Sequence, residues 1–180
     1  MEALLVERSG PLRGTVEVSG SKNAALPILA ACLLTEEESV IEHVPHVTDV
    51  STMIDILRTL GVEVVQQEER VLVRPDRYQG WTAPYALVSL MRASVCVLGP
   101  LLTRHKRARV SMPGGCVIGL RPIDLHLKGL QALGADITMD HGDVVAKASR
   151  LRGTTIHLAG SFGSSVLATA NVLMAAVFAE

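Results

Sequence analysis

The stretch Thr52 to Val73, "TMIDILRTLGVEVVQQEERVLV", returns in altered form at Leu125 to Ala146 as "LHLKGLQALGADITMDHGDVVA". Each stretch has apolar residues at helical spacing, a glycine that ends the helix, and two β-rich runs joined by a charged turn. Five positions correspond at the constant offset that separates Gly61 from Gly134: Leu57, Leu60, Gly61, Glu63 and Val64 match Leu130, Leu133, Gly134, Asp136 and Ile137. One helix–strand–strand unit is therefore predicted to occur twice.

The segments before each stretch extend this unit. An apolar helix and a strand are predicted at 23–34 and 39–44 before the first copy, and at 85–102 and 107–112 before the second. After Arg152, the run "TTIHLAG" and an apolar helix at 164–180 begin a third copy, which we expect to be truncated at Glu180. The predicted class is α/β, built from helix–strand–helix–strand–strand repeats, with the apolar helices packed inside and sheets around them.

Composition limits the classes of function. The chain has 180 residues, is 48% hydrophobic and carries a net charge of −1 with 3% aromatic residues, which indicates a globular protein and no nucleic-acid partner. Its longest apolar runs, 24–34 and 172–179, are far shorter than the roughly 20 residues that span a bilayer, and the first residues do not resemble a signal peptide. We expect a cytoplasmic protein without a membrane segment.

The three cysteines are spaced unlike a disulfide framework or a zinc site, so free thiols and no metal are predicted. Cys116 lies in the glycine-rich loop "SMPGGCVIGLRPID" (111–124), before a helix predicted to start at Pro122. A helix amino terminus and nearby basic residues could lower its pKa and make the thiol reactive; these residues are Arg104, Lys106, Arg107, Arg109 and Arg121. Alternatively, Cys116 is a small buried apolar residue.

Three further features could bind an anion. Lys22 and Asn23 precede a helix, where backbone N–H groups and an ammonium could hold a phosphate, although a simple capping loop would look the same. Arg92 lies within an apolar run and needs either a partner, an anionic ligand or a route to solvent. The run "AGSFGSS" (159–165) is similar to a glycine-rich anion loop, but such short patterns are common.

Four stretches together resemble the UDP-N-acetylglucosamine 1-carboxyvinyltransferase family of enolpyruvyl transferases: "SGSKNAALPILAACLL", "MRASVCVLGPLL", "PGGCVIGLRPIDLHLKGLQALGA" and "SSVLATANVLMAA". The resemblance covers essentially the whole chain, as the amino-terminal portion of such an enzyme. It implies an inside-out α/β barrel whose two domains, of three repeats each, bind substrates between them. Residues 21–180 would be two full repeats and part of a third in the first domain, and residues 1–20 a strand segment that pairs with the second domain.

The resemblance also implies roles for individual residues. Cys116 matches the general acid that fosfomycin alkylates, and acts with Lys22 and Arg121 in catalysis. Lys22 and Asn23 match a phosphoenolpyruvate-binding pair, while Arg92 and Arg121 match arginines near the anionic groups of the substrates. The matches for the nucleotide-sugar site are Arg121, Pro122, Ile123, Asp124, Leu125, Ser165 and Val166. Leu167 departs from the family, which has glycine there.

The implied reaction transfers the enolpyruvyl group of phosphoenolpyruvate to the 3-hydroxyl of UDP-N-acetylglucosamine with release of phosphate, the first committed step of peptidoglycan synthesis. It needs no metal or organic cofactor. The family's general-base aspartate belongs to the second domain, so the isolated chain is expected to be inactive. Two alternatives remain: a 5-enolpyruvylshikimate 3-phosphate synthase-like transferase, and a non-catalytic module that binds a nucleotide sugar.

Overall fold

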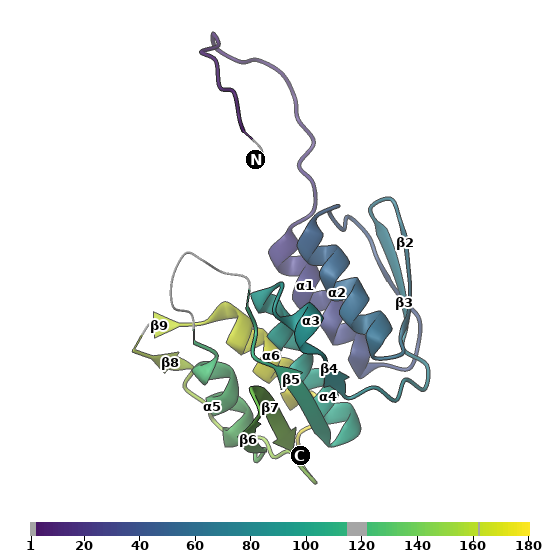
Figure 1. Ribbon diagram of the computed structural model, residues 1–180, viewed down its shortest axis with the longest axis vertical. Helices are drawn as coiled ribbons and strands as arrows, with labels where there is room; N and C mark the ends of the chain where they lie inside the picture. Colours follow the sequence, from purple (N-terminus) through teal and green to yellow (C-terminus); the bar gives the residue numbers. More distant parts are fainter. Residues whose placement is uncertain (1–2, 115–121, 162) are drawn as a thin grey trace.

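The computed structural model describes residues 3–114, 122–161 and 163–180 (Figure 1). The first copy of the repeat forms an antiparallel sheet in the order β1-β3-β2, with two main helices. Its elements are α1 (Lys22–Ala31), the 3-10 turn η1 (Cys32–Leu34), β1 (Ser39–Ile41), α2 (Thr48–Thr59), β2 (Glu63–Gln67) and β3 (Arg70–Arg74).

The second copy forms a sheet in the order β4-β5-β7-β6, in which the short edge strand β4 runs parallel to β5. Its elements are β4 (Thr82–Ala83), α3 (Tyr85–Val88), η2 (Arg92–Val97), α4 (Leu98–His105), β5 (Arg107–Ser111), α5 (Asp124–Ala132), β6 (Asp136–Asp140) and β7 (Asp143–Lys147). A small hairpin, β8 (Ala159–Gly160) with β9 (Gly163–Ser164), then leads into α6 (Val166–Ala176).

The predicted order of helix, strand, helix, strand and strand is confirmed in both copies. The same turn ends the second helix of each. Gly61 has φ +92° and Gly134 has φ +98°, a left-handed conformation that glycine adopts without a Cβ penalty. Two backbone hydrogen bonds close each turn: Gly61 N to Arg58 O and Val62 N to Leu57 O in the first copy, Gly134 N to Gln131 O and Ala135 N to Leu130 O in the second.

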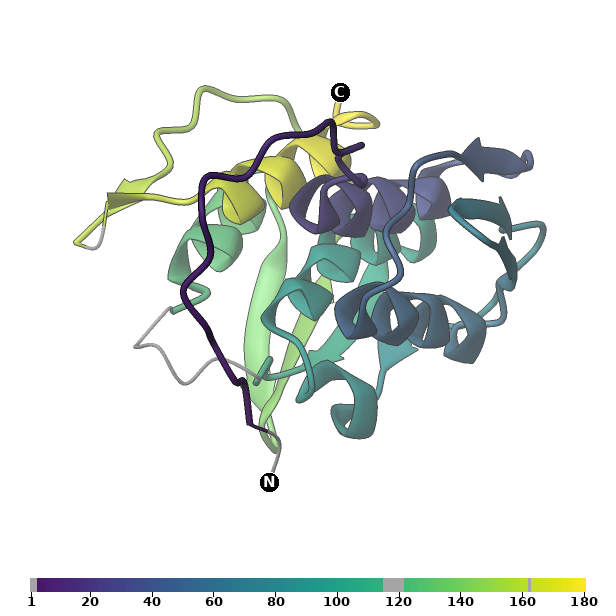
Figure 2. The same ribbon diagram turned by 90° about the horizontal axis from the view of Figure 1, so that it is seen from above.

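Helix contacts join the copies, and the sheets flank them. Helix α6 contacts α1, α4, α5 and η2, and Figure 2 shows α1 and α6 side by side. The core is filled by large apolar side chains that are fully buried: Leu29, Leu33, Met53, Ile54, Ile56, Leu57, Leu60, Leu98, Leu101, Leu102, Leu130 and Leu133. The burial expected of the apolar helices is only partly correct, because Ile28 of α1 and Leu173 of α6 are exposed.

Three expectations need correction. The single helix predicted at 85–102 is divided into α3, η2 and α4, because Met91 is extended (φ −147°, ψ 130°) and the Ser94 hydroxyl donates to the carbonyls of Val88 and Met91. The strand predicted at 154–160 is reduced to Ala159–Gly160, which finds a partner only in β9. The helix predicted to begin at Pro122 begins at Asp124, and Ile123 occupies its N-cap.

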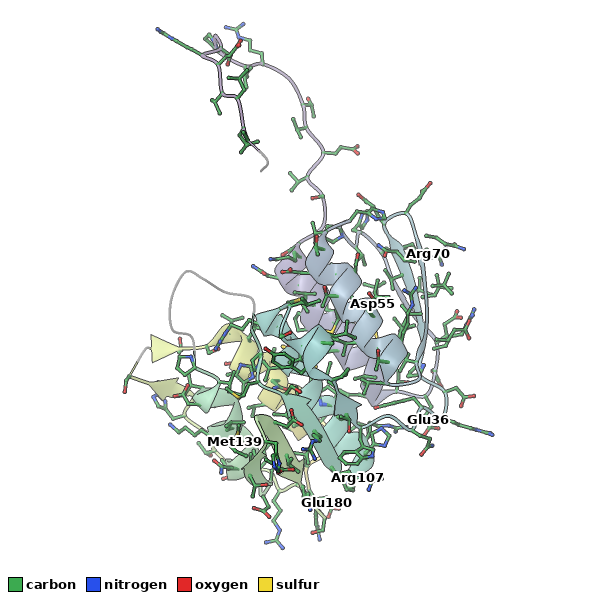
Figure 3. All side chains as sticks on the ribbon, in the orientation of Figure 1. Glu36, Asp55, Arg70, Arg107, Met139 and Glu180 are labelled. Atoms are coloured by element: carbon green, nitrogen blue, oxygen red, sulfur yellow. The ribbon has the colours of Figure 1, made fainter. Side chains whose placement is uncertain are left out.

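Residues 3–19 form neither helix nor strand and are exposed. This segment extends away from the helices and sheets, and its side chains project into solvent (Figures 1 and 3). Within the described ranges, no helix combines the length and apolarity needed to span a membrane.

Candidate functional site

An open cleft of about 360 Å³ lies where three segments distant in sequence converge. They are the start of η2, the start of α5 and the β8–β9 hairpin that leads into α6. The cleft is lined by Arg92, Val95, Pro122, Asp124, Leu125, His126, Gly160, Gly163, Ser164, Ser165, Val166 and Leu167. Six residues proposed from the sequence as substrate-binding therefore share one cavity: Arg92, Pro122, Asp124, Leu125, Ser165 and Val166.

The start of α5 forms one wall of this cleft. The carbonyl of Ile123 accepts hydrogen bonds from the N–H groups of His126 and Leu127, and the Ile123 side chain is buried in the core rather than in the cleft. Asp124 is placed in the first helical turn, where its negative charge complements the helix dipole. The β8–β9 hairpin lies close to this helix start, since a Cβ on Gly160 would lie 3.3 Å from Leu125 Cδ2.

The start of α6 forms the opposite wall. Ser165 is its N-cap, and the Ser165 hydroxyl accepts a hydrogen bond from Ala168 N at 3.2 Å. The first N–H groups of any α-helix lack intrahelical acceptors, and the positive end of the dipole lies there. An anionic group in the cleft would therefore face favourable partial charge at this end of α6.

Arg92 supplies a full positive charge to the cleft. Its guanidinium donates from Nη2 to the carbonyl oxygen of Pro122 at 2.7 Å, which links η2 to the residues before α5. Arg92 thus has the partner that its apolar surroundings demand, and it also lines the cavity. Planar guanidinium groups bind phosphate and carboxylate oxygens through paired N–H donors.

No role was assigned from the sequence to two polar residues here: His126, which lines the cleft, and Asn171, which contacts His126. His126 is 3% exposed, and its Nδ1 lies 3.0 Å from Nδ2 of the fully buried Asn171 on α6. Burial and the Arg92 charge lower the pKa of His126 to about 4, although Asp124 acts in the opposite direction. The available signal was Asn171 itself, a single amide in an otherwise apolar helical run that must find a hydrogen-bond partner when buried.

Lys22 and Asn23 lie apart from the cleft lining, at the exposed start of α1. Lys22 Nζ forms an ion pair with Asp49 Oδ2 at 2.6 Å, and Asp49 belongs to the first turn of α2. Cys116 and Arg121 fall outside the described residues. The predicted catalytic group, which joins them with Lys22, therefore stays a prediction.

Three of the basic residues that precede the cysteine loop in the sequence have identified neighbours. Arg104 pairs with Glu36, Arg109 pairs with both Asp140 and Asp143, and the Arg107 guanidinium lies 4.5 Å from the Trp81 ring centroid. Arg104 belongs to α4, whereas Arg107 and Arg109 belong to β5 of the second sheet (Figure 3 labels Arg107).

The other two cysteines are buried free thiols, as the sequence predicted. Burial raises the pKa of Cys96 to about 12, and it also raises the pKa of Cys32. Neither thiol is suited to nucleophilic chemistry at neutral pH, because the thiolate is the reactive form. In the ranges that the structure describes, no three His, Cys, Asp or Glu residues gather in a group able to bind a metal.

Comparison with known proteins gives consistent results. The profile of the EPSP synthase family (3-phosphoshikimate 1-carboxyvinyltransferase) matches residues 6–180. The chain is 55% identical over 180 residues to UDP-N-acetylglucosamine 1-carboxyvinyltransferase from Methylacidiphilum infernorum, and 52% identical to UDP-N-acetylglucosamine 1-carboxyvinyltransferase 2 from Carboxydothermus hydrogenoformans. Each match covers 100% of the chain but only 42% of the relative, so the chain spans about two fifths of their length.

Solved structures share the fold at low identity. The enolpyruvyl transferase NikO from Streptomyces tendae superposes with a TM-score of 0.67 at 24% identity, over 78% of this chain and 31% of that one. EPSP synthase from Acinetobacter baumannii superposes with a TM-score of 0.67 at 21% identity, over 93% of this chain and 38% of that one.

Proposed function

Since the chain belongs to the EPSP synthase family of enolpyruvyl transferases, we propose that it forms part of an enzyme that transfers the enolpyruvyl group of phosphoenolpyruvate to UDP-N-acetylglucosamine. The observation that carries this choice of acceptor is the 52–55% identity, over the whole chain, to two enzymes named for that substrate. The shikimate-pathway alternative has weaker support, because the EPSP synthase of known structure is only 21% identical. On this proposal, the protein acts in the cytoplasm at the first committed step of peptidoglycan synthesis.

The cleft between α5 and α6 is the proposed site for the nucleotide sugar. Arg92 and the amino terminus of α6 supply positive charge for a diphosphate, with Ser165 and Val166 at that terminus. The segment Arg121 to Leu125 would hold the uridine, with Pro122, Asp124 and Leu125 at the cleft wall and Ile123 anchoring the segment in the core. Leu167 adds an apolar side chain to this lining where the family has glycine.

Phosphoenolpyruvate is proposed to bind between the start of α1 and the cysteine loop. Lys22 offers a compact ammonium charge that is 45% exposed beside Asp49, and Asn23 adds an amide next to it. Arg121 would neutralise further negative charge. Cys116 would protonate C3 as a general acid while the sugar 3-hydroxyl attacks C2.

The second step would break the bond between C2 and the phosphate oxygen and remove a proton from C3, which leaves the vinyl ether and free phosphate. The acceptor's proton would go to the aspartate that the resemblance places in a second domain, so the 180-residue chain alone is expected to show no turnover. A non-catalytic module that binds the nucleotide sugar is the second candidate, because the cleft is assembled within this chain. No step of the proposed reaction requires a metal or an organic cofactor.

The test joins residues 1–180 to the remaining portion of the Methylacidiphilum infernorum relative and measures phosphate release. Turnover is expected with phosphoenolpyruvate plus UDP-N-acetylglucosamine, and none with shikimate 3-phosphate as acceptor. Cys116→Ser should abolish labelling by fosfomycin, whereas Cys32→Ser and Cys96→Ser should leave one equivalent bound. Turnover with shikimate 3-phosphate alone would overturn the proposal.

Residues 1–20 are proposed to pair with the second domain. Trypsin should cut the 180-residue chain first after Arg8 or Arg13, since both lie in the exposed segment. The same bonds should be protected in the joined protein. Equal cleavage in both would contradict this domain assignment.

A further inference from the structure

The buried amide of Asn171 has only one orientation that satisfies its neighbours. The Gly99 N–H lies 2.8 Å from Asn171 Oδ1, and a backbone N–H can only donate, so that atom must be the oxygen. Asn171 Nδ2 lies 3.0 Å from the carbonyl oxygen of Val95, which can only accept. Two backbone groups, on α4 and η2, therefore fix the amide independently of His126.

This orientation decides the state of the His126 ring. The second hydrogen of Asn171 Nδ2 faces His126 Nδ1 at 3.0 Å, so Nδ1 must accept and carries no proton. A neutral imidazole then has its proton on Nε2. A charged ring would place two donors face to face. Burial and Arg92 oppose that charge, while Asp124 acts in the opposite direction.

The remaining ring nitrogen is available to a ligand. His126 lines the cleft together with Arg92, Ser165 and Leu167. Across the described parts of the chain, the polar contact of the His126 ring is the one between Nδ1 and Asn171, and Nε2 does not belong to the fully buried side-chain atoms that lack a hydrogen-bond partner. Because His126 belongs to the cleft lining, we expect its Nε2–H to donate to an acceptor on whatever fills the cleft.

We infer that Asn171 is a positioning residue that locks His126 as the neutral Nε2–H tautomer, so that His126 donates an uncharged hydrogen bond to a phosphate oxygen in the cleft. The choice of a phosphate oxygen rests on the proposed function, whereas the tautomer does not. Beside Arg92, an uncharged donor adds directional recognition without adding a second positive charge. It would also favour a ligand whose oxygen can accept from both groups.

The first test reads the tautomer directly on the 180-residue chain labelled with ¹⁵N. Long-range ¹H–¹⁵N correlation at pH 7 should show His126 protonated on Nε2 only. Asn171→Ala should release the lock and give a mixture of tautomers, whereas Thr169→Ala, an exposed position on α6, should leave the wild-type pattern. A wild-type ring protonated on Nδ1, or on both nitrogens, would overturn the inference.

The second test asks what the donor binds. His126→Asn keeps a hydrogen-bonding group near the position of Nδ1 but has none at the position of Nε2. In the joined enzyme this variant should raise KM for UDP-N-acetylglucosamine about tenfold, the effect of one hydrogen bond, with kcat within threefold. His126→Gln, whose amide N–H can reach the Nε2 position, should restore most of that loss. Inorganic phosphate, added to the labelled chain, should shift the Nε2–H signal.

The outcomes separate this inference from the proposed function. If the joined enzyme uses UDP-N-acetylglucosamine while His126→Asn has wild-type KM, the donor role is wrong and the proposed function stands. If the enzyme does not use UDP-N-acetylglucosamine, the proposed function fails, while the tautomer and phosphate measurements still decide the inference. Equal KM values for His126→Asn and His126→Gln, both raised, would reduce His126 to a packing residue.

Discussion

The His126 imidazole is stabilised in its neutral form by the fold. Its pKa is about 4 in the folded chain and near 6.5 when unfolded, so between these values the unfolded state binds more protons. The neutral ring contributes stability above pH 6.5, and that contribution falls as the pH drops towards 4. The shift corresponds to about 3 kcal/mol across this window.

This predicts a steep acid dependence that one substitution removes. The free energy of unfolding, from urea titrations at pH 7 and pH 4.5, should fall by about 2–3 kcal/mol more in the wild type than in His126→Gln, which has no proton to bind. Asp140 and Asp143, whose pKa values are lowered by hydrogen bonds from His141 and Ser111 respectively and by Arg109, act in both proteins and cancel in the difference. An equal loss in both proteins would show that His126 takes up its proton as readily in the folded chain as in the unfolded one.

The ion pair of Lys22 and Asp49 should matter little to stability. The Lys22 side chain is 45% exposed and the Asp49 side chain 34%, and exposed ion pairs contribute about 0–1 kcal/mol to stability. Asp49→Asn should therefore lower the free energy of unfolding by less than about 1 kcal/mol, whereas Leu57→Ala, in the core of the same helix, should cost about 2–5 kcal/mol. A cost of Asp49→Asn near that of Leu57→Ala would show that the pair supports the fold.

At this scale, the sequence was informative where residues are neighbours along the chain. Pro122, Asp124 and Leu125 share one cleft because a single helix start presents them. The hydrogen bond between His126 and Asn171 spans 45 residues, and its choice of partners depends on how three helical segments meet. Periodicity and spacing carry no such information.

Helices α5 and α6 are packed closely enough to exclude a methyl group. A Cβ on Gly129 of α5 would lie 2.3 Å from Val172 Cγ2 and 3.1 Å from Leu158 Cδ2. Glycine is here the residue that allows α5 to approach α6, although it is unfavourable inside a helix by up to about 1 kcal/mol relative to alanine. Close packing outweighs helix propensity at this position.

Gly129→Ala should therefore destabilise the chain by about 1–3 kcal/mol, despite the better helix former. Gln131→Ala, at an exposed position of the same helix, should change stability by no more than about 0.5 kcal/mol. In a Val172→Ala background, Gly129→Ala should cost clearly less, because the clashing methyl group is gone. Additive effects in this double-mutant cycle, measured by urea unfolding, would contradict the proposed contact.

Element boundaries show why part of the fold was predictable. The turns at Gly61 and Gly134 depend on local hydrogen bonds, so matching sequences produced matching turns in both copies. The break at Met91 lies inside a mainly apolar stretch, where hydrophobic periodicity does not reveal it. Most of the strand expected at 154–160 is absent, because a strand needs a neighbouring strand, which the local sequence does not encode.

The whole molecule leaves apolar surface uncovered on α6. Leu173 is 62% exposed and Val177 is 66% exposed, four positions apart on one side of the helix, and Phe178 follows them. A hydrophobic dye should therefore bind the 180-residue chain, and Leu173→Lys with Val177→Lys should reduce its fluorescence by more than half with a stability change within about 0.5 kcal/mol. Met139→Lys, at a 56% exposed site on β6, is the matched control and should leave dye binding nearly unchanged.

Every strand pairing in the described residues lies within one copy of the repeat, and only helices and loops connect the copies. A gene duplication of this unit therefore adds a complete sheet, and the new strands do not have to form hydrogen bonds with the strands of an existing sheet. Asp76 and Arg77 are exposed and lie in the linker between the copies, where two units could be joined. A unit from one relative could accordingly be exchanged for that of another, provided that the facing helix surfaces, the Arg104–Glu36 ion pair and the contacts of the linker residue Tyr78 are kept.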